Sequence, residues 1–459
     1  MAYGLDDRRT IFALATGIGK SAIAVIRISG PNSGRAVESL IGRLPAPRRA
    51  VLRTIAEPST QNILDRGLVL WLPGPDSFTG EDSAELHVHG ARGVVAAILR
   101  VLGELEGLRP ALAGEFARRS LENGKSNLIA VEALGDLIEA ETEQQRRMAM
   151  AQASGDLHLA AEQWRNSLID ALATIESELD FSDESEAHRA SHHESKAIIT
   201  DILTTMAPLT VGNARVERIR EGLTVLIAGP PNAGKSTLLN AIARRDVAIV
   251  SERAGTTRDL IEVKLDLAGF PVNLIDTAGI QATDDPVEQE GIRRALRKSA
   301  DADLILWLTS AEDGSFLPPK EFAGRPIWHI ITKLDRHDAE EQSAAGDAEA
   351  DLTDGPRPTC KLAISARTGK NLEKLIGRLE NHASETMSVE GSMLVANERQ
   401  RFAIVMAQEA LSAGLDENAP LEVVADELRR ACFALESLMG KVGVEDVLDR
   451  LFSRFCIGK

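Results

Sequence analysis

The stretch from Gly229 to Thr237 constrains this chain more than any other part of its sequence. It reads Gly-Pro-Pro-Asn-Ala-Gly-Lys-Ser-Thr and fits G-x-x-x-x-G-K-[ST], a glycine-rich turn whose backbone N–H groups surround phosphates. An apolar, β-branched run (223–228) precedes it, and apolar residues at helical spacing (237–243) follow. Strand, turn and helix N-terminus together direct positive potential to one point. The sequence therefore predicts a P-loop, with Lys235 at the β- and γ-phosphates and Ser236 on Mg²⁺.

Two segments further along predict that the bound base is guanine. The first, Thr332-Lys-Leu-Asp335, follows a predicted buried strand. Its terminal carboxylate can accept two hydrogen bonds from guanine, whereas adenine offers no such pair of donors. The second, Ser365-Ala-Arg367, follows the last predicted strand and resembles the second guanine-contacting loop of G proteins. The alternative is a pair of strand-end turns with incidental charge. The residues expected at the base are Thr332, Lys333, Asp335, Ser365, Ala366 and Arg367.

Two motifs between these segments match the γ-phosphate side of a GTPase. Asp276-Thr-Ala-Gly279 resembles the γ-phosphate sensor, in which the carboxylate holds Mg²⁺ through water and the glycine lets its N–H approach the phosphate. Gly255-Thr-Thr-Arg-Asp259 lies where switch I belongs, so Thr257 is the expected second hydroxyl on Mg²⁺. Four motifs in this order predict a GTP hydrolase of the translation-factor-like class. The residues expected around the phosphates are Asn232, Ala233, Gly234, Lys235, Ser236, Thr237, Thr256, Thr257, Asp276, Thr277, Ala278 and Gly279.

The position after the sensor glycine departs from many GTPases. They place a glutamine there to orient the attacking water, but this chain has Ile280, which cannot do so. Another group or a cation must therefore order the nucleophile. Sequence spacing alone leaves four nearby candidates open: Gln281, Asp284, Asp285 and Glu288.

The composition of the chain limits what else it can be. Its 459 residues suggest about three domains. A net charge of −17 argues against binding nucleic acid mainly through a positive field. No signal peptide and no apolar run of about 18 residues is visible, so we expect a cytoplasmic protein. Three scattered cysteines, Cys360, Cys432 and Cys456, argue against a disulfide framework or a zinc site.

Hydrophobic periodicity divides the chain into four parts. We predict a mixed α/β domain over 1–122, a helical part over 123–216, a doubly wound P-loop GTPase (Ras-like) domain over 217–380 and a second helical part over 381–459. The two helical parts are expected to pack together, so the GTPase domain would be inserted into a helical domain. An acidic loop is predicted over 180–195. Expected strands lie at 23–28, 67–72, 84–89, 223–228, 262–267, 272–276, 304–308, 327–332 and 361–365.

Three segments near the ends of the chain resemble one known family. They are Arg27-Ile-Ser-Gly30, Gly74-Pro-Asp-Ser-Phe-Thr-Gly-Glu-Asp82 and the C-terminal Phe455-Cys-Ile-Gly-Lys459. With the P-loop and switch I motifs, they closely resemble the tRNA modification GTPase family MnmE (TrmE) over essentially the whole chain. The resemblance implies modification of C5 of the wobble uridine of certain tRNAs. The product is an aminomethyl or carboxymethylaminomethyl group, installed in a heterotetramer with the flavin-dependent partner MnmG (GidA).

The resemblance also implies a folate site and a homodimer. The family's N-terminal domain binds 5-formyl-tetrahydrofolate, or a related folate, and dimerises. Its pocket residues correspond to Arg27, Glu85, Lys125 and Lys459, whose charges suit the folate glutamate and the amino-pteridine. Cys456 corresponds to a candidate catalytic or substrate-contacting thiol.

A potassium ion is implied in place of the missing glutamine. Members of the family hydrolyse GTP when two GTPase domains pair around K⁺. Its ligands correspond to Asn232, Ser251, Arg253 and Thr256, and Ser251 is also expected to contact GTP. The family's catalytic glutamate corresponds to Glu288, and K⁺ would neutralise transition-state charge.

Two other functions remain open from the sequence. One is a regulatory G protein of ribosome assembly, although such proteins usually carry a basic appendage that this chain lacks. The other is a folate-dependent one-carbon transferase with an accessory GTPase domain.

Overall fold

The computed structural model contains two compact units. One comprises Met1–Gly135, Ala153–Thr200 and Met406–Lys459, and the other comprises Asp136–Gln152 and Asp201–Val405. The structure describes residues 8–180, 187–210, 213–245, 247–249, 262–276, 302–310, 318, 322, 324–336, 360–388, 394–395, 397–416, 418–441, 451 and 458, without the side chains of 180–194 and 213–214.

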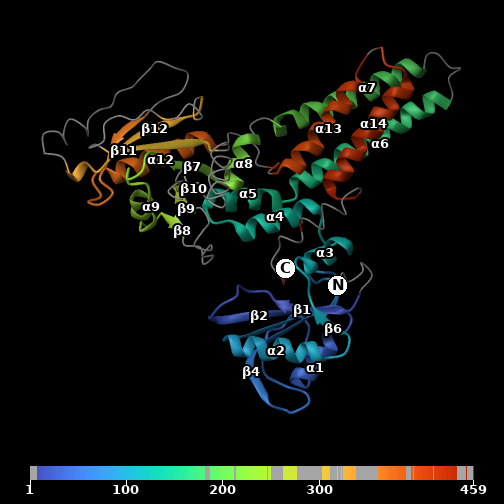
Figure 1. Cartoon of the computed structure of the whole chain (residues 1–459). Coiled ribbons are helices and arrows are strands. Elements are labelled where there is room, and N and C mark those ends of the chain that lie inside the picture. The colour runs from blue at the N-terminus through green and yellow to red at the C-terminus, as the bar shows by residue number, and fades with distance from the viewer. Residues whose placement is uncertain are drawn as a thin grey trace, which may run out of the picture. The chain divides into compact units, whose positions relative to one another are not determined.

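The first unit begins with a six-stranded sheet of order β3-β4-β5-β2-β1-β6 (Figure 1). All neighbours pair antiparallel except β1 and β6. The strands are β1 Thr10–Leu14, β2 Ser21–Ser29, β3 Val51–Ala56, β4 Ile63–Leu72, β5 Ser83–Gly90 and β6 Leu108–Pro110. Helices α1 (Ser33–Ile41) and α2 (Arg92–Glu104) pack on the sheet, where apolar residues of β2 alternate inward. Residue alternation therefore places Arg27 on the face opposite to Ile26 and Ile28.

Helices make up the remainder of the first unit. They are α3 (Glu115–Glu122), α6 (Asp156–Asp180) and α14 (Leu421–Met439), with parts of α4 (Leu128–Glu139), α7 (Ala187–Thr210) and α13 (Glu398–Gly414). α6 and α14 lie side by side, and Arg165 of α6 pairs with Glu436 of α14 at 2.6 Å (Figure 1). The predicted packing of an early helical stretch against a late one is confirmed. Among the described residues, no helix combines the length and the apolarity needed to cross a membrane.

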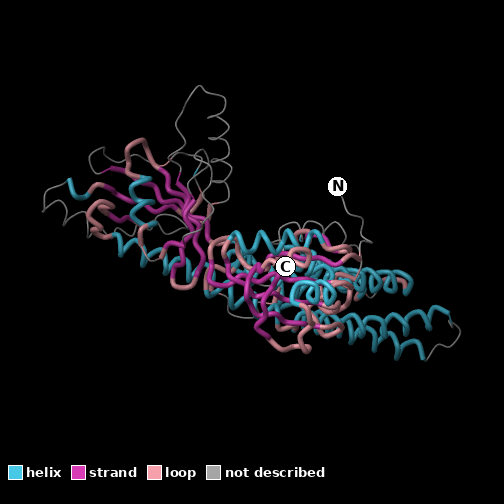
Figure 2. Tube along the Cα trace, turned by 90° about the horizontal axis from the view of Figure 1, so that it is seen from below, coloured by secondary structure: helices cyan, strands magenta, loops and turns pink. Residues whose placement is uncertain are grey.

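The second unit is built on a seven-stranded sheet of order β13-β12-β11-β7-β10-β9-β8. Its strands are among those drawn in magenta in Figure 2. β13, β12, β11, β7 and β10 run parallel, while β9 and β8 pair antiparallel. The strands are β7 Leu223–Ala228, β8 Ala248–Ile249, β9 Glu262–Leu267, β10 Phe270–Asp276, β11 Leu304–Ser310, β12 Ile327–Thr332 and β13 Lys361–Ala363. In the described part of this unit, the helices are α5 Glu143–Ala153, α8 Asn213–Glu221, α9 Lys235–Ala243 and α12 Leu372–Met387, with the remaining parts of α4, α7 and α13.

Most predicted strands match the structure closely, but one predicted loop is wrong in part. α7 begins at Ala187, within the segment 180–195 that the sequence predicts as an acidic loop. That segment lacks an apolar stripe, but alanine, here Ala187 and Ala190, favours a helix by its intrinsic propensity alone. The predicted domain limits stay a prediction, because the two units combine the four parts differently.

Candidate nucleotide-binding site

Four predicted segments meet at the carboxyl edge of the parallel strands. The P-loop follows β7, Asp276 ends β10, Thr332 ends β12, and Ser365 lies just beyond β13. These strands belong to one sheet, in which β7 pairs with β10 and β12 with β13, while β11 lies between the two pairs; Asp276 is opposite Ile227 in the β10–β7 register. In such α/β sheets, ligands bind outside the carboxyl ends of the strands.

The backbone of the P-loop explains its glycines. Gly229 has φ +150°, and a Cβ there would lie 2.2 Å from the carbonyl oxygen of Leu308. Gly234 has φ +89° and precedes α9. Asn232 has φ +63°, a left-handed conformation that asparagine tolerates better than most residues. The conformation therefore requires glycine at the first position and favours glycine or asparagine at the other two.

Lys235 closes this loop on itself. Its Nζ donates hydrogen bonds to the carbonyl oxygens of Gly229 at 2.9 Å and Pro230 at 3.0 Å. Burial lowers the pKa of this ammonium, and the carboxylate of Asp276 opposes that shift. Both acceptors are neutral carbonyls, so a phosphate oxygen would offer the ammonium a stronger, charged partner.

Ser236 and Asp276 form the pair that suits Mg²⁺. The Ser236 hydroxyl donates to Oδ2 of Asp276 at 2.8 Å. A hydroxyl and a carboxylate are oxygen ligands, which Mg²⁺ prefers, and this ion also draws ligands from water and substrate phosphates. Among the described residues, no cluster of three or more histidine, cysteine or acidic side chains suits a metal. The oxygen pair fits an ion that is bound with few protein ligands.

The base-side segments are tied to the phosphate side through Thr332. Its buried hydroxyl lies 2.6 Å from the carbonyl oxygen of Ala233 in the P-loop and 3.2 Å from that of Thr309 in β11. From the sequence, Thr332 is expected at the base. Its position in the TKLD segment gave no signal for this contact with the phosphate loop.

Asp335 is held by the second base-side segment. The Ser365 hydroxyl donates to Oδ1 of Asp335 at 2.7 Å, and this bond is the main reason that the pKa of Asp335 is lowered. Lys333 adopts φ +60°, and Leu334 N donates to the Ile364 carbonyl at 3.2 Å. The two segments therefore present an ionised carboxylate from a braced turn. Ala366 and Arg367 follow Ser365 in the same turn.

In the first unit, two of the predicted folate residues pair with each other. Arg27 of β2 and Glu85 of β5 face each other across the strands, with Nη2 and Oε1 3.1 Å apart. The Arg27 guanidinium also lies over the rings of Phe78 (5.4 Å) and Phe116 (5.8 Å). Burial acts to raise the pKa of Glu85, but hydrogen bonds from His87 and Arg27 leave it lowered. Arg27 and Glu85 thus satisfy each other in this structure.

Lys125 lies beside the loop that carries one family motif. A Cβ built on Gly80 would meet its Cγ at 3.1 Å. The backbone N–H of Lys125 donates to the Ser120 carbonyl at 2.8 Å, which fixes it just after α3.

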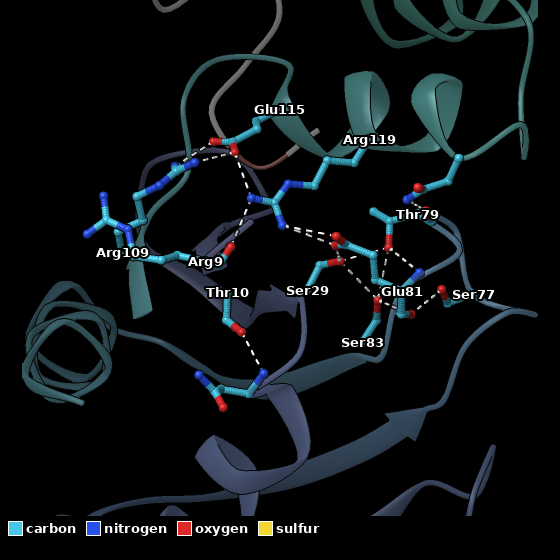
Figure 3. A network of polar contacts seen from close by, with 12 residues as sticks. Arg9, Thr10, Ser29, Ser77, Thr79, Glu81, Ser83, Arg109, Glu115 and Arg119 are labelled. Carbon is cyan, nitrogen blue, oxygen red and sulfur yellow. Dashed lines mark hydrogen bonds and ion pairs between the residues drawn. The ribbon is translucent and has the colours of Figure 1, made fainter. Parts of the chain in front are cut away.

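A buried polar network connects two of the motifs that carry the resemblance (Figure 3). Arg119 donates to Glu115 at 3.0 Å and to Glu81 at 3.1 Å, and Glu115 also accepts from Arg109 at 2.6 Å. The hydroxyl of Ser29 donates to the same Glu81 carboxylate at 2.7 Å. The segments 27–30 and 74–82 are therefore joined through Ser29, Glu81 and α3. The sequence marks both motifs as a family signature but carries no signal for their contact.

Several predicted site residues lie outside the described residues, so the structure leaves them as predictions. They are Ser251, Arg253, Thr256, Thr257, Thr277, Ala278, Gly279, Glu288, Cys456 and Lys459. The open candidates Gln281, Asp284 and Asp285 lie outside them as well.

Comparison with known proteins covers almost the entire chain. The family described as MnmE helical domain matches residues 128–456, and the GTP-binding protein TrmE N-terminus matches residues 10–125. Proteins named tRNA modification GTPase MnmE from Beijerinckia indica subsp. indica and Bradyrhizobium sp. (strain ORS 278) are each 47% identical over 98% of this chain, covering 96% and 99% of their own lengths. The one from Methylobacterium sp. (strain 4-46) is 48% identical, covering 98% of this chain and 99% of its own. The chain therefore belongs to the tRNA modification GTPase MnmE family.

Proposed function

We propose that this chain binds and hydrolyses GTP. The observation that carries the proposal is the meeting of the P-loop, Asp276 and the Asp335–Ser365 pair at one sheet edge. Lys235 would exchange its loop carbonyls for phosphate oxygens, and the lowered pKa keeps Asp335 ionised to accept from guanine. Ser236 and Asp276 would hold Mg²⁺, which when bound offsets charge on the phosphates.

The substitution Asp335→Asn tests whether Asp335 recognises guanine. The substitution replaces an acceptor with an amide that can also donate, and xanthine carries a carbonyl where guanine carries its amine. We expect the preference for GDP over XDP to reverse, measured as the ratio of the two dissociation constants. An unchanged ratio would remove Asp335 from the base site.

We propose that hydrolysis depends on K⁺ and on Glu288. The support is the family membership, Ile280 at the usual glutamine position, and Asn232, which is exposed in the P-loop. Its neutral amide oxygen suits a weakly hydrated monovalent cation, and Ser251, Arg253 and Thr256 would supply the other ligands. Turnover should be much faster in KCl than in NaCl at equal ionic strength, and equal rates would sink the K⁺ mechanism.

We propose that GTP hydrolysis serves modification of tRNA at C5 of the wobble uridine, with an MnmG-type flavoprotein. The relatives are named tRNA modification GTPases. The N-terminal domain (1–122) would bind 5-formyl-tetrahydrofolate and form a cytoplasmic homodimer. Arg27, Glu85, Lys125 and Lys459 would contact the folate, and Cys456 is the candidate thiol. Mass spectrometry of tRNA from a deletion strain should show unmodified wobble uridines, and unchanged tRNA would favour a role in ribosome assembly instead.

A further inference from the structure

The segment Asp136–Gln152 lies outside the predicted GTPase domain, yet it packs in the same unit as the nucleotide-binding sheet. It contacts the β9–β10 hairpin at two points. The backbone N–H of Gln144 donates to the Gly269 carbonyl in the hairpin turn at 3.1 Å. Glu141 pairs with Lys264 of β9 at 2.7 Å. The hairpin is therefore held at the end away from Asp276.

Gln145 links the same segment to the helix that leads into the P-loop strand. Its Oε1 accepts from the N–H groups of Glu141 (2.9 Å) and Thr142 (3.1 Å), which caps the start of α5. Its Nε2 donates to the carbonyl oxygen of Arg220 in α8 at 3.1 Å. The side chain of Arg220 in turn pairs with Asp136 at 2.9 Å. One glutamine thus uses both ends of its amide to join two elements.

The hairpin and α8 are also joined directly. Asn273 of β10 donates from Nδ2 to the Glu221 carbonyl at 2.8 Å, at the point where α8 meets β7. Met148 of α5 is buried in the same apolar cluster as Leu267 and Phe270 of the hairpin. Segment, hairpin and α8 therefore form one contiguous junction.

The strands that leave this junction carry the nucleotide-site residues at their far ends. β7 runs from Leu223 to the P-loop, and β10 runs from Phe270 to Asp276. The two strands are paired from Val272 opposite Leu223 to Asp276 opposite Ile227. Since β10 continues from the hairpin and β7 continues from α8, the contacts at this junction help to set the position of Asp276 relative to the P-loop at the other ends of these strands.

We propose that the segment Asp136–Gln152 positions the nucleotide site. The positioning residues are Gln145 and Glu141 of the segment and Lys264 of the hairpin. The proposal rests on the proposed binding of GTP. On both sides of this segment, the chain continues into the other unit, at Gly135 and Ala153. Since coupling of binding free energies is reciprocal, nucleotide binding would in turn act on the chain at these two positions, where it passes into the other unit.

The dissociation rate of a fluorescent GDP from the full chain, measured with Mg²⁺ present, tests the proposal without requiring turnover. Gln145→Glu keeps the acceptor that caps α5 and removes the donor to Arg220. We expect it to raise the rate about fivefold, within the range of couplings that such networks carry. The matched control is Arg147→Gln on the same helix, because Arg147 is exposed and pairs with Glu143. Its rate should equal that of the unmodified chain.

A charge exchange provides the second arm. Glu141→Lys and Lys264→Glu should each raise the rate about twofold, and the double variant should restore it, because opposite charges face each other again. Loss of folded protein would lower the amplitude of release and leave its rate unchanged, so the rate separates positioning from stability. A rate for Gln145→Glu equal to the control, or no restoration in the double variant, overturns the proposal. Failure of the unmodified chain to bind GDP would instead refute the proposed function.

Discussion

The two polar regions of this molecule use their charged groups in opposite ways. In the N-terminal network, Arg119 and Glu115 are buried and each pairs with charged groups of the chain itself. At the nucleotide edge, Lys235 bonds to neutral loop carbonyls, and Asp335 is held by one hydroxyl. Both regions contain family motifs. The difference teaches that the first set of motif residues forms ion pairs within the chain, whereas Lys235 and Asp335 hydrogen-bond to neutral groups that a ligand can replace.

Removing Arg119 should have the largest effect on stability. Arg119→Ala removes a buried cation from the half-buried carboxylate of Glu81 and leaves Glu115 with Arg109, and breaking a buried ion pair typically costs about 3–5 kcal/mol. We expect the unfolding transition of the first unit to move to lower denaturant, measured by hydrogen exchange of β1 and α3. GDP affinity should stay the same.

The neighbouring residue supplies the control. Arg118 pairs with the exposed Glu122 within α3, so Arg118→Ala should cost less than about 1 kcal/mol. Equal losses for the two variants would contradict the view that the network stabilises the first unit through Arg119.

Removing Lys235 should have the opposite pattern of effects, with weaker nucleotide binding and little change in stability. Lys235→Ala removes a charge-assisted contact to phosphate of about 1.5–3 kcal/mol, or about 10- to 150-fold in affinity. Binding of GTP should weaken to that extent in a titration, while unfolding changes little because the lost partners are two exchangeable carbonyl bonds. A large loss of stability with unchanged affinity would reverse the assignment of the two regions.

The sequence predicted the strands and the P-loop turn of the nucleotide edge because their signals are local. The P-loop needs glycine at positions of positive φ and a lysine and serine directly after them, so one stretch of chain specifies it. The alternating β/α pattern then predicts parallel strands, whose carboxyl ends lie at one edge of the sheet. Asp276 and Asp335 reach one edge for that reason.

The N-terminal network and the junction at Gln145 could not be predicted in this way. Each depends on contacts between residues far apart in sequence, such as Arg119 with Glu81 or Gln145 with Arg220. No periodicity encodes which buried carboxylate meets which guanidinium. The start of α7 at Ala187 is not predicted for a different reason, because this part of the helix carries no apolar stripe in its sequence.

Thr332 combines features of both kinds of polar residue, those that bond within the chain and those expected at the nucleotide. Its hydroxyl bonds within the chain, but the Ala233 carbonyl that accepts it belongs to the P-loop. Thr332→Val keeps the shape and leaves that carbonyl short of a donor, at a cost of about 1–2 kcal/mol. We expect both the stability of the second unit and GDP affinity to fall, measured by denaturation and by titration. Thr332→Ser should restore both. A fall in stability alone would place Thr332 with the structural residues.

The smallest effect is expected from Ser365, which tunes Asp335 rather than replacing it. The hydrogen bond from Ser365 holds the pKa of Asp335 below its ordinary value of 3.8. Because the pKa is lowered, the carboxylate stays ionised at every pH above this folded-state pKa. Its charge is lost only as the pH falls through that pKa. GDP affinity of the unmodified chain should therefore be insensitive to Asp335 between pH 8 and about pH 5. In Ser365→Ala the pKa rises toward its ordinary value of 3.8, so at about pH 4 a further loss of up to about twofold should appear relative to the unmodified chain. If the variant and the unmodified chain share one pH profile, the hydroxyl braces the turn without tuning the charge, and Ser365 belongs with the residues whose partner is the chain itself.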